Sequence, residues 1–431
     1  MAALRVGWIG LGNMGQPMAL NLQSLLTRTH ASADTAAALP FPVDPQLRVY
    51  NRTPSKAAAV EALGAHVCST VQALAQDCDV IFTSLNNDQT VVAVYRDILA
   101  ALRTRQVPDN LPQTPVYLVE TSTISPELSR QLDQDVQLVA GAQPHDQSPI
   151  HFLRCPVFGP PVYAQTSSLI WVLSGPAQAC ADIRALVIPS LGRGVIEMGE
   201  DVAKGSRMKL VGNFFVASAI EAVAEGAALA EASGVSVSKM MEFIQWGYPQ
   251  GSFLNYGKKT LRPEEIPAHA STVSSVPTMV PIAASDATIS TAAMASARAE
   301  EPMTSDTNPL TVPTQFRATM AQTPVGTPLS EDSDGMADGQ PSNQVVKDDF
   351  ITDVGFNVDL CLKDTRLIRD MAQKSNCRLP VIEALETHLK AVQAKGLNEW
   401  DAITAVVATR WEAGLPGYYN DTTHPQRSPP E

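Results

Sequence analysis

A lysine and an asparagine stand four residues apart in an apolar stretch, at a spacing that suits proton transfer. Lys209 and Asn213 lie within residues 208–215, whose other members are apolar or glycine. Residues four apart on a helix project from the same face, which here offers a proton carrier and an amide. Lysine transfers protons near neutral pH when burial and a neighbouring cation, such as Arg207 or Lys363, lower its pKa. This chemistry suits oxidation of an alcohol or reduction of a carbonyl.

The alternative for Lys209 is an ordinary solvated helix lysine. Its apolar neighbours instead predict a helix that is buried on most sides, where a lysine needs a functional reason. The helical pattern runs from Gly205 to Gly234 with many alanines, so the sequence predicts one long, closely packed helix. A shorter helix capped by Ser236 is predicted to end at Gly247.

A glycine-rich turn near the start of the chain predicts a nucleotide-binding element. The run Leu4–Gly15 breaks into Gly10, Gly12 and Gly15 and continues at helical spacing, which predicts a strand, a tight turn and a helix. Gly10 permits the turn, Gly12 lets a pyrophosphate approach the backbone, and Gly15 lets the helix pack on the strand. The phosphates would sit on N–H groups at the helix N-terminus. A purely structural turn is the alternative.

The end of the second predicted strand indicates the cofactor. Residues 47–50 are followed by Asn51, Arg52 and Thr53, where a dinucleotide fold places the residue that meets the adenosine ribose. An acid there would bind a 2′-hydroxyl, whereas Arg52 suits a 2′-phosphate. The sequence therefore favours NADP, with NAD as the alternative, unless Arg52 is only a solvated turn residue.

Strand and helix patterns alternate up to about Met198, which predicts an α/β Rossmann domain with a doubly wound, mostly parallel sheet over residues 1–198. Residues 27–46 lack a clear period and are predicted to be an inserted surface loop. Residues 199–416 are predicted to form an all-α domain for substrate binding and oligomerisation. Residues 262–346 are rich in Ser, Thr, Ala and Pro, which predicts a disordered insertion, although a retained intron would look similar. A disordered tail is predicted for residues 417–431.

Composition narrows the partners of this 431-residue chain. Its formal net charge of −13 argues against nucleic acid or an anionic membrane as the main partner. No apolar run is expected to approach the roughly 20 residues of a membrane helix, and a strand that starts beside Met1 predicts no cleavable signal. The six cysteines form no C-x-x-C pair, which predicts a reducing, cytoplasmic compartment and no metal site. Cys155 is expected to pack in the core.

Four separated stretches resemble the β-hydroxyacid dehydrogenase family, which includes 3-hydroxyisobutyrate dehydrogenase and glyoxylate or succinic semialdehyde reductases. The run Gly10–Leu22 resembles the family's extended dinucleotide motif in an NADP-binding domain of the 6-phosphogluconate dehydrogenase type. The run Glu120–Pro126 is similar to its D-x-S-T-x-x-P segment. Gly205–Asn213 is similar to its G-x-x-x-K-x-x-x-N stretch, and Leu362–Leu367 to its late K-D-L motif.

The resemblance implies a Rossmann domain, an all-α domain and an active site in the cleft between them. It implies that Lys209 is the catalytic group, that Asn213 helps to hold the substrate hydroxyl, and that the chain forms a homo-oligomer. Substrate contacts are expected from Ser122 and Gly159. Cofactor contacts are expected from Gly10, Leu11, Gly12, Asn13, Met14, Gly15, Asn51, Arg52, Thr53, Leu85, Thr123 and Lys363. Without the resemblance, Ser122 and Thr123 would be taken as a helix cap and Lys363 as half of a surface ion pair.

The sequence departs from the family's pattern beside the expected substrate. Glu120 stands in place of the first Asp of D-x-S-T, which is a mild change. More consequential is the segment Pro156–Pro161, PVFGPP, where the family usually shows P-V-S-G-G. Phe158 replaces a small hydroxyl residue that helps to bind the substrate carboxylate, and Pro160 removes an N–H. A bulky ring is expected to reshape the pocket and make it less polar.

Three functions follow from these observations. The first is an NADP-dependent oxidoreductase that interconverts a short β-hydroxyacid and its semialdehyde, or reduces a related small carbonyl, with Lys209 as acid and base. The second is imine reduction, which Phe158 favours slightly and Lys209 disfavours. The third is a non-catalytic NADP-binding scaffold whose inserted loop recruits partners. The joint presence of Lys209, Asn213 and Lys363 argues against the third.

Overall fold

The computed structural model describes residues 3–31, 39–105, 114–142, 149–260 and 354–415. By their internal contacts, these described residues belong to one compact unit. The insertion predicted at 262–346 and the tail predicted at 417–431 lie outside the described residues.

A six-stranded parallel sheet forms the N-terminal part of the molecule. Its strand order, β3-β2-β1-β4-β5-β6, is that of a doubly wound dinucleotide-binding fold. The strands are β1 (Val6–Ile9), β2 (Arg48–Tyr50), β3 (His66–Val67), β4 (Val80–Thr83), β5 (Val116–Glu120) and β6 (Ile150–Arg154). Helices cover both faces of this sheet, which explains why β1, β4 and β5 are buried throughout and mostly apolar.

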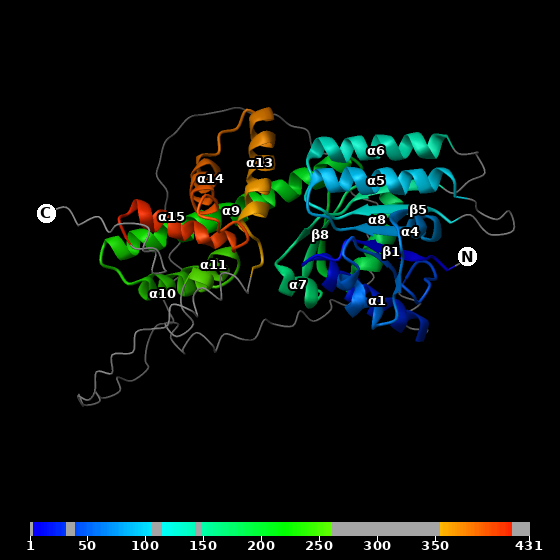
Figure 1. Cartoon of the computed structure of the whole chain (residues 1–431), viewed down its shortest axis with the longest axis horizontal. Coiled ribbons are helices and arrows are strands. Elements are labelled where there is room, and N and C mark those ends of the chain that lie inside the picture. Colours follow the sequence, from blue (N-terminus) through cyan, green and yellow to red (C-terminus); the bar gives the residue numbers. More distant parts are fainter. Residues whose placement is uncertain (1–2, 32–38, 106–113, 143–148, 261–353, 416–431) are drawn as a thin grey trace, which may run out of the picture. The chain divides into compact units, whose positions relative to one another are not determined.

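The helices of this part are α1 (Gly15–Ala31), α3 (Ala58–Glu61), α4 (Val71–Asp77), α5 (Asp88–Arg103), α6 (Pro126–Gly141), α7 (Pro161–Gln165) and α8 (Ala177–Val187), with a 3-10 turn η1 (Pro54–Ala57). Helices α5 and α6 lie side by side on one face of the sheet, and α1 lies on the other (Figure 1). Side chains of β1 alternate between the two cores, with Trp8 in one and Ile9 in the other.

A second, three-stranded sheet follows, with the order β7-β8-β9. Its strands are β7 (Val157–Phe158), β8 (Leu169–Leu173) and β9 (Gly192–Glu197). The sequence patterns did not predict β9, because it contains Gly192 and Gly194 and glycine is uncommon in strands. Gly192 is nevertheless required, because a Cβ there would lie 2.5 Å from the Trp171 ring.

The predicted loop over residues 27–46 was partly wrong. Helix α1 continues to Ala31, and its last turn stays helical because Thr29 is buried and its hydroxyl donates to the Leu25 carbonyl. Near the other end of the segment, Val43 is buried and forms a parallel bridge with Leu4. Residues 32–38 lie outside the described part of the chain.

The C-terminal part is helical, as predicted. Its helices are α9 (Val202–Ala232), α10 (Val237–Gly247), α11 (Ser252–Thr260), α13 (Val358–Lys374), α14 (Pro380–Gln393) and α15 (Ala405–Glu412), with a 3-10 turn η4 (Ala402–Thr404). Helix α9 is the centre of this part, since α11, α13, α14 and α15 all pack against it (Figure 1). It starts three residues before the predicted Gly205, because Asp201 caps it by accepting from the Ala203 N–H.

Among the described residues, α9 is also the one helix whose length and composition would suit a membrane span. By this measure, the expectation that no apolar run is long enough was wrong. Half of its most apolar window is buried inside the protein, as befits a helix with other helices packed around it. Buried polar side chains, including Asn213 and Glu221, interrupt its apolar surface.

Candidate active site

The turn between β1 and α1 has the geometry that its glycines predict. Gly10 has a φ of +98°, a backbone conformation that side chains rarely adopt. A Cβ at Gly15 would lie 2.0 Å from the Gly10 carbonyl oxygen, so glycine is needed for α1 to start so close to β1. A Cβ at Gly12 would meet nothing within 4 Å, which leaves open space beside the backbone. The first turn of α1 has no acidic residue. The turn therefore fits an anionic pyrophosphate.

Asn51 connects the end of β2 to this turn. Its Oδ1 accepts a hydrogen bond of 2.9 Å from the Leu11 N–H, and its Nδ2 donates to the Thr53 carbonyl oxygen at 2.9 Å. Both ends of the Asn51 side-chain amide thus form hydrogen bonds within the protein, which hold the end of β2 against the glycine turn. The Arg52 side chain beside it is exposed, as a phosphate-binding guanidinium would be. Of the remaining cofactor candidates in this region, Asn13 and Thr53 are exposed, Met14 is partly buried and Leu11 is buried.

Ser122 and Thr123 follow β5 at the carboxyl edge of the sheet, where doubly wound folds bind ligands. The Ser122 hydroxyl accepts a hydrogen bond of 2.8 Å from the Leu85 N–H, which places these two candidates side by side. The Ser122 N–H donates to the Glu120 carboxylate at 2.6 Å. The alternative role of a helix cap is wrong for Ser122 and Thr123, because Ser125 caps α6 by accepting from the Leu128 N–H.

Asp364 brings the predicted catalytic pair together with Lys363. Asn213 donates from Nδ2 to Asp364 Oδ2 at 2.6 Å, and both residues are buried. Lys363 Nζ lies 2.9 Å from Asp364 Oδ1. The Asp364 charge also acts on Lys209, one turn before Asn213 on α9. The sequence motif contained Asp364, but the reasoning from sequence gave it no role.

The environment of Lys209 makes its neutral amine easier to form than that of an ordinary lysine. Although the residue keeps some exposed surface, burial of its ammonium group lowers its pKa from the ordinary value to about 8. The negative charge of Asp364 opposes this shift, whereas the positive charges of Lys363 and Arg154 add to it. Of the two cations expected to act on Lys209, Lys363 therefore does so. Arg207 instead pairs with Asp201 at 3.4 Å, near the surface.

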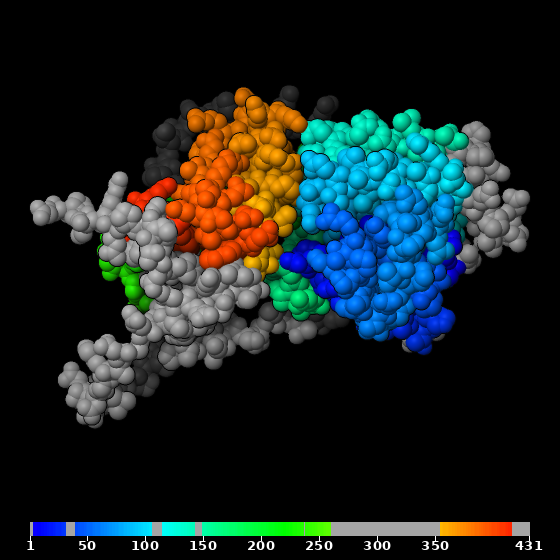
Figure 2. All heavy atoms as spheres, viewed as in Figure 1, coloured from blue at the N-terminus to red at the C-terminus, as the bar shows by residue number. Residues whose placement is uncertain are grey.

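Lys363 also links the helical part to the Rossmann part. Its Nζ donates to the Thr123 carbonyl oxygen at 3.0 Å and to the Asn86 carbonyl oxygen at 3.4 Å. Further along α13, Lys374 pairs with Glu127 of α6 at 2.8 Å. Figure 2 shows the orange surface of α13 beside the cyan surface of α5 and α6. These contacts place Lys209 and Asn213 in the same neighbourhood as the carboxyl end of β5.

The Phe158 side chain packs beside Lys209. Lys209 Nζ lies 4.7 Å from the centroid of the Phe158 ring, within cation–π range. A Cβ at Gly212 would lie 2.2 Å from Phe158 Cε1, so the ring rests directly on the backbone of α9. Gly159, the other substrate candidate, is exposed and has a φ of +136°.

Arg154 is a site component that the sequence reasoning missed. It is 0% exposed at the end of β6. Its Nε donates to the Ser206 hydroxyl at 2.8 Å, its Nη1 to the Glu120 carbonyl oxygen at 2.5 Å, and its Nη2 to the Ser122 carbonyl oxygen. One side chain thus ties the loop after β5 to the start of α9. An arginine between apolar residues, in a segment predicted to belong to the first domain, was the available signal.

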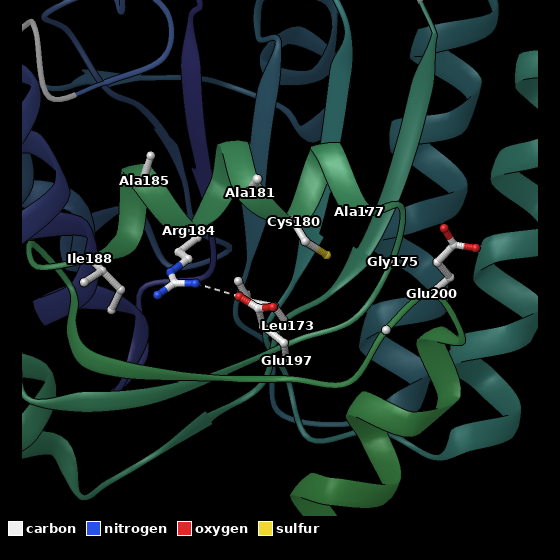
Figure 3. Close-up of a pocket in the computed structure, with 11 residues that line it drawn as sticks. Leu173, Gly175, Ala177, Cys180, Ala181, Arg184, Ala185, Ile188, Glu197 and Glu200 are labelled. Atoms are coloured by element: carbon white, nitrogen blue, oxygen red, sulfur yellow. Dashed lines mark hydrogen bonds and ion pairs between the residues drawn. The ribbon is translucent and has the colours of Figure 1, made fainter. Parts of the chain in front are cut away.

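A surface hollow of about 410 Å³ lies away from these residues, between α8 and the end of β9 (Figure 3). Ala177, Ala181 and Ala185 line one side, and Arg184 reaches across to Glu197 at 2.7 Å. None of the predicted site residues lines it. We therefore place the candidate active site around Lys209.

Comparison with known proteins agrees with this site. Residues 43–199 match the NAD binding domain of 6-phosphogluconate dehydrogenase. The glycine turn precedes the matched residues, but β1 pairs with β2 and β4 in the same sheet. A 2-(hydroxymethyl)glutarate dehydrogenase of Eubacterium barkeri is 25% identical over 245 residues, which are 56% of this chain and 68% of that protein.

Two further similar proteins are 3-hydroxyisobutyrate dehydrogenases. The mitochondrial enzyme of Drosophila melanogaster is 26% identical over 242 residues, covering 56% of this chain and 63% of that protein. The structure of the Mycobacterium tuberculosis enzyme with L-serine has a TM-score of 0.58 and 17% identity, and covers 94% of this chain and 98% of that chain. At this identity, the structural likeness shows the shared fold. The chain therefore contains a dinucleotide-binding domain of the 6-phosphogluconate dehydrogenase type and is similar to 3-hydroxyisobutyrate dehydrogenases in sequence and fold, as an NAD(P)-dependent dehydrogenase or reductase acting on CH–OH groups.

Proposed function

We propose that this enzyme uses NADP to interconvert a short β-hydroxyacid and its semialdehyde, or to reduce a related small carbonyl, with Lys209 as acid and base. The observation that carries the proposal is a partly buried lysine with a pKa of about 8, next to the Asn213–Asp364 pair. A group with this pKa exists in both protonation states near neutral pH, as proton transfer in both directions requires.

In oxidation, the neutral Lys209 amine takes the proton of the substrate hydroxyl as the carbonyl forms. In reduction, the Lys209 ammonium returns that proton to the carbonyl oxygen. The bound nicotinamide accepts or supplies the hydride. Asp364 fixes the Asn213 amide by accepting one N–H of its Nδ2, which leaves the other N–H to donate to the substrate oxygen. Lys363 donates to the Thr123 carbonyl oxygen. It thereby holds the loop that would lie beside the nicotinamide ribose.

The test is an assay of NADPH oxidation by the purified chain over a panel of semialdehydes, glyoxylate, small uncharged aldehydes and cyclic imines. We expect turnover of at least one carbonyl compound, and formation of the matching alcohol. Turnover of the imines alone would replace the proposal with imine reduction. NADPH binding without turnover of any compound would contradict the proposed reaction.

Arg52→Asp is expected to change the cofactor preference. An exposed guanidinium at the end of β2 can bind a 2′-phosphate, and loss of a charged hydrogen bond costs about 1.5–3 kcal/mol. We therefore expect the Kd for NADPH to rise by about tenfold to a hundredfold, while the Kd for NADH stays the same or falls. Fluorescence titration measures both. Arg96→Asp, at an arginine whose side chain is 77% exposed on α5, is the control. Equal effects of the two variants on NADPH binding would contradict this role of Arg52.

A further inference from the structure

The Phe158 ring and Gly212 fit each other across two elements that are distant in the sequence. Phe158 ends β7, and Gly212 lies within α9. Ring atoms Cε1 and Cζ would lie 2.2 and 2.3 Å from a Cβ at position 212. Contacts this short exclude any side chain there while the ring keeps its position. Glycine in a helix interior lowers helix stability by about 0.5–1 kcal/mol relative to alanine, so its presence here needs a reason. The ring supplies one.

The same ring lies beside the group that we assign to proton transfer. Lys209 Nζ is 4.7 Å from the ring centroid. A substrate oxygen that hydrogen-bonds to Nζ lies about 2.8–3.0 Å from it. Substituents on the reacting carbon are then within van der Waals reach of Phe158. The face of an aromatic ring carries negative electrostatic potential, so it favours a cation such as the Lys209 ammonium and disfavours a substrate carboxylate.

The residues around Phe158 offer little to bind an anion. Of the three residues that follow it, Pro160 and Pro161 have no N–H, so Gly159 contributes the one backbone donor. Apart from Lys209, which is assigned to the reacting oxygen, three nearby cations already have partners. Lys363 pairs with Asp364 and donates to Thr123. Arg154 donates to the Ser206 hydroxyl and to two backbone carbonyl oxygens. Arg207 pairs with Asp201.

We propose that Phe158 and Gly212 form a specificity pair, which selects a substrate with an uncharged, apolar group next to the reacting carbonyl over one with a carboxylate. The inference rests on the proposed function and chooses between its two substrate classes. It favours small apolar aldehydes or ketones over semialdehydes of acids. Phe158 contributes the apolar wall, and Gly212 makes room for it.

Two substrates that differ only in charge test the proposal. We would measure kcat/KM with NADPH for succinic semialdehyde and for its methyl ester. For the unchanged chain, we expect the ester to be preferred by about tenfold or more. In Phe158→Ser, a hydroxyl replaces the ring, and we expect the ester-to-acid ratio to fall by at least about tenfold. Phe158→Leu keeps an apolar wall without a ring, so its preference for the ester should remain.

Gly212→Ala tests the pairing. The added methyl group displaces the ring, so we expect the ester preference to weaken when Phe158 is present. In a Phe158→Ser background, the same change should have little effect on the ratio, because no ring is there to displace. Equal effects of Gly212→Ala in both backgrounds would contradict the pairing.

The outcomes separate this inference from the proposed function. Preference of the unchanged chain for the acid, or a ratio that Phe158→Ser leaves unchanged, overturns the specificity pair and leaves the oxidoreductase proposal standing. Turnover of neither of these substrates nor of any carbonyl compound in the panel above, with NADPH bound as shown by fluorescence, overturns the proposed function itself and the inference with it.

Discussion

Lys209→Met is expected to lower kcat by about 10²–10⁴-fold, the usual contribution of a positioned general acid or base, while the Kd for NADPH changes little. Methionine has a similar length and an apolar end, so it keeps the packing on α9 but carries no proton. Lys209→Arg is the matched variant, because arginine retains the positive charge but does not deprotonate near neutral pH. Both variants should be inactive in single-turnover measurements of hydride transfer.

The pH dependence provides a second test of Lys209. Its pKa of about 8 gives oxidation and reduction opposite dependences on pH. Oxidation needs the neutral amine, so its rate should rise with pH through about 8. Reduction needs the ammonium, so its rate should fall over the same range. Asp364→Asn removes the charge that stabilises the ammonium and should move both profiles to lower pH.

Thermal unfolding distinguishes these effects from misfolding. Burial disfavours the charged form of Lys209, so Lys209→Met should leave Tm unchanged or raise it. Normal turnover by this variant would contradict the assignment. So would a loss of NADPH binding equal to the loss of kcat, because Lys209 would then act by holding the cofactor.

The parts of the site that sequence could predict are those encoded by local patterns. The four-residue spacing of Lys209 and Asn213 placed them on one helix face, and the structure places both beside Asp364. The glycine turn could be predicted from its local pattern, because Gly10 and Gly15 each answer a local steric need. The parallel sheet followed from alternating strands and helices, since few topologies satisfy that order.

What sequence could not predict depends on contacts between distant segments. Phe158 was identified as unusual, but its fit against Gly212 appears only when β7 meets α9. Arg154 gave a local signal, a charge in an apolar strand, yet its partners come from other parts of the chain. The extension of α1 beyond Thr27 includes Thr29 and His30, which have weak helix preference, and Thr29 is buried there by contacts that the local sequence does not show.

Arg154→Met is expected to have the largest effect on stability, at about 3–5 kcal/mol, the usual cost of breaking a buried charged network. Arg154 is fully buried, and its guanidinium satisfies two carbonyl oxygens and the Ser206 hydroxyl. Burial raises the pKa of Glu120, and the Arg154 charge opposes that shift. Removing Arg154 therefore leaves a buried carboxyl group without its compensating charge. Equilibrium unfolding in urea measures the loss.

Arg184→Met is the control that makes this prediction specific. Arg184 also forms an ion pair, at 2.7 Å to Glu197, but both side chains are more than half exposed (Figure 3). Exposed pairs contribute about 0–1 kcal/mol, so the control should unfold almost as the unchanged chain does. If both variants lost equal stability, Arg154 would not be the buried link between β5, β6 and α9.

The same variant separates positioning from simple destabilisation. Arg154 holds the Ser122 carbonyl oxygen and the Ser206 hydroxyl, and its positive charge helps to lower the pKa of Lys209. Measured well below its Tm, Arg154→Met should therefore shift the pH profile of reduction to higher pH, because the Lys209 ammonium is then easier to form. A destabilised protein with an unchanged active site would keep the original profile. A shift toward lower pH would contradict the electrostatic role of Arg154.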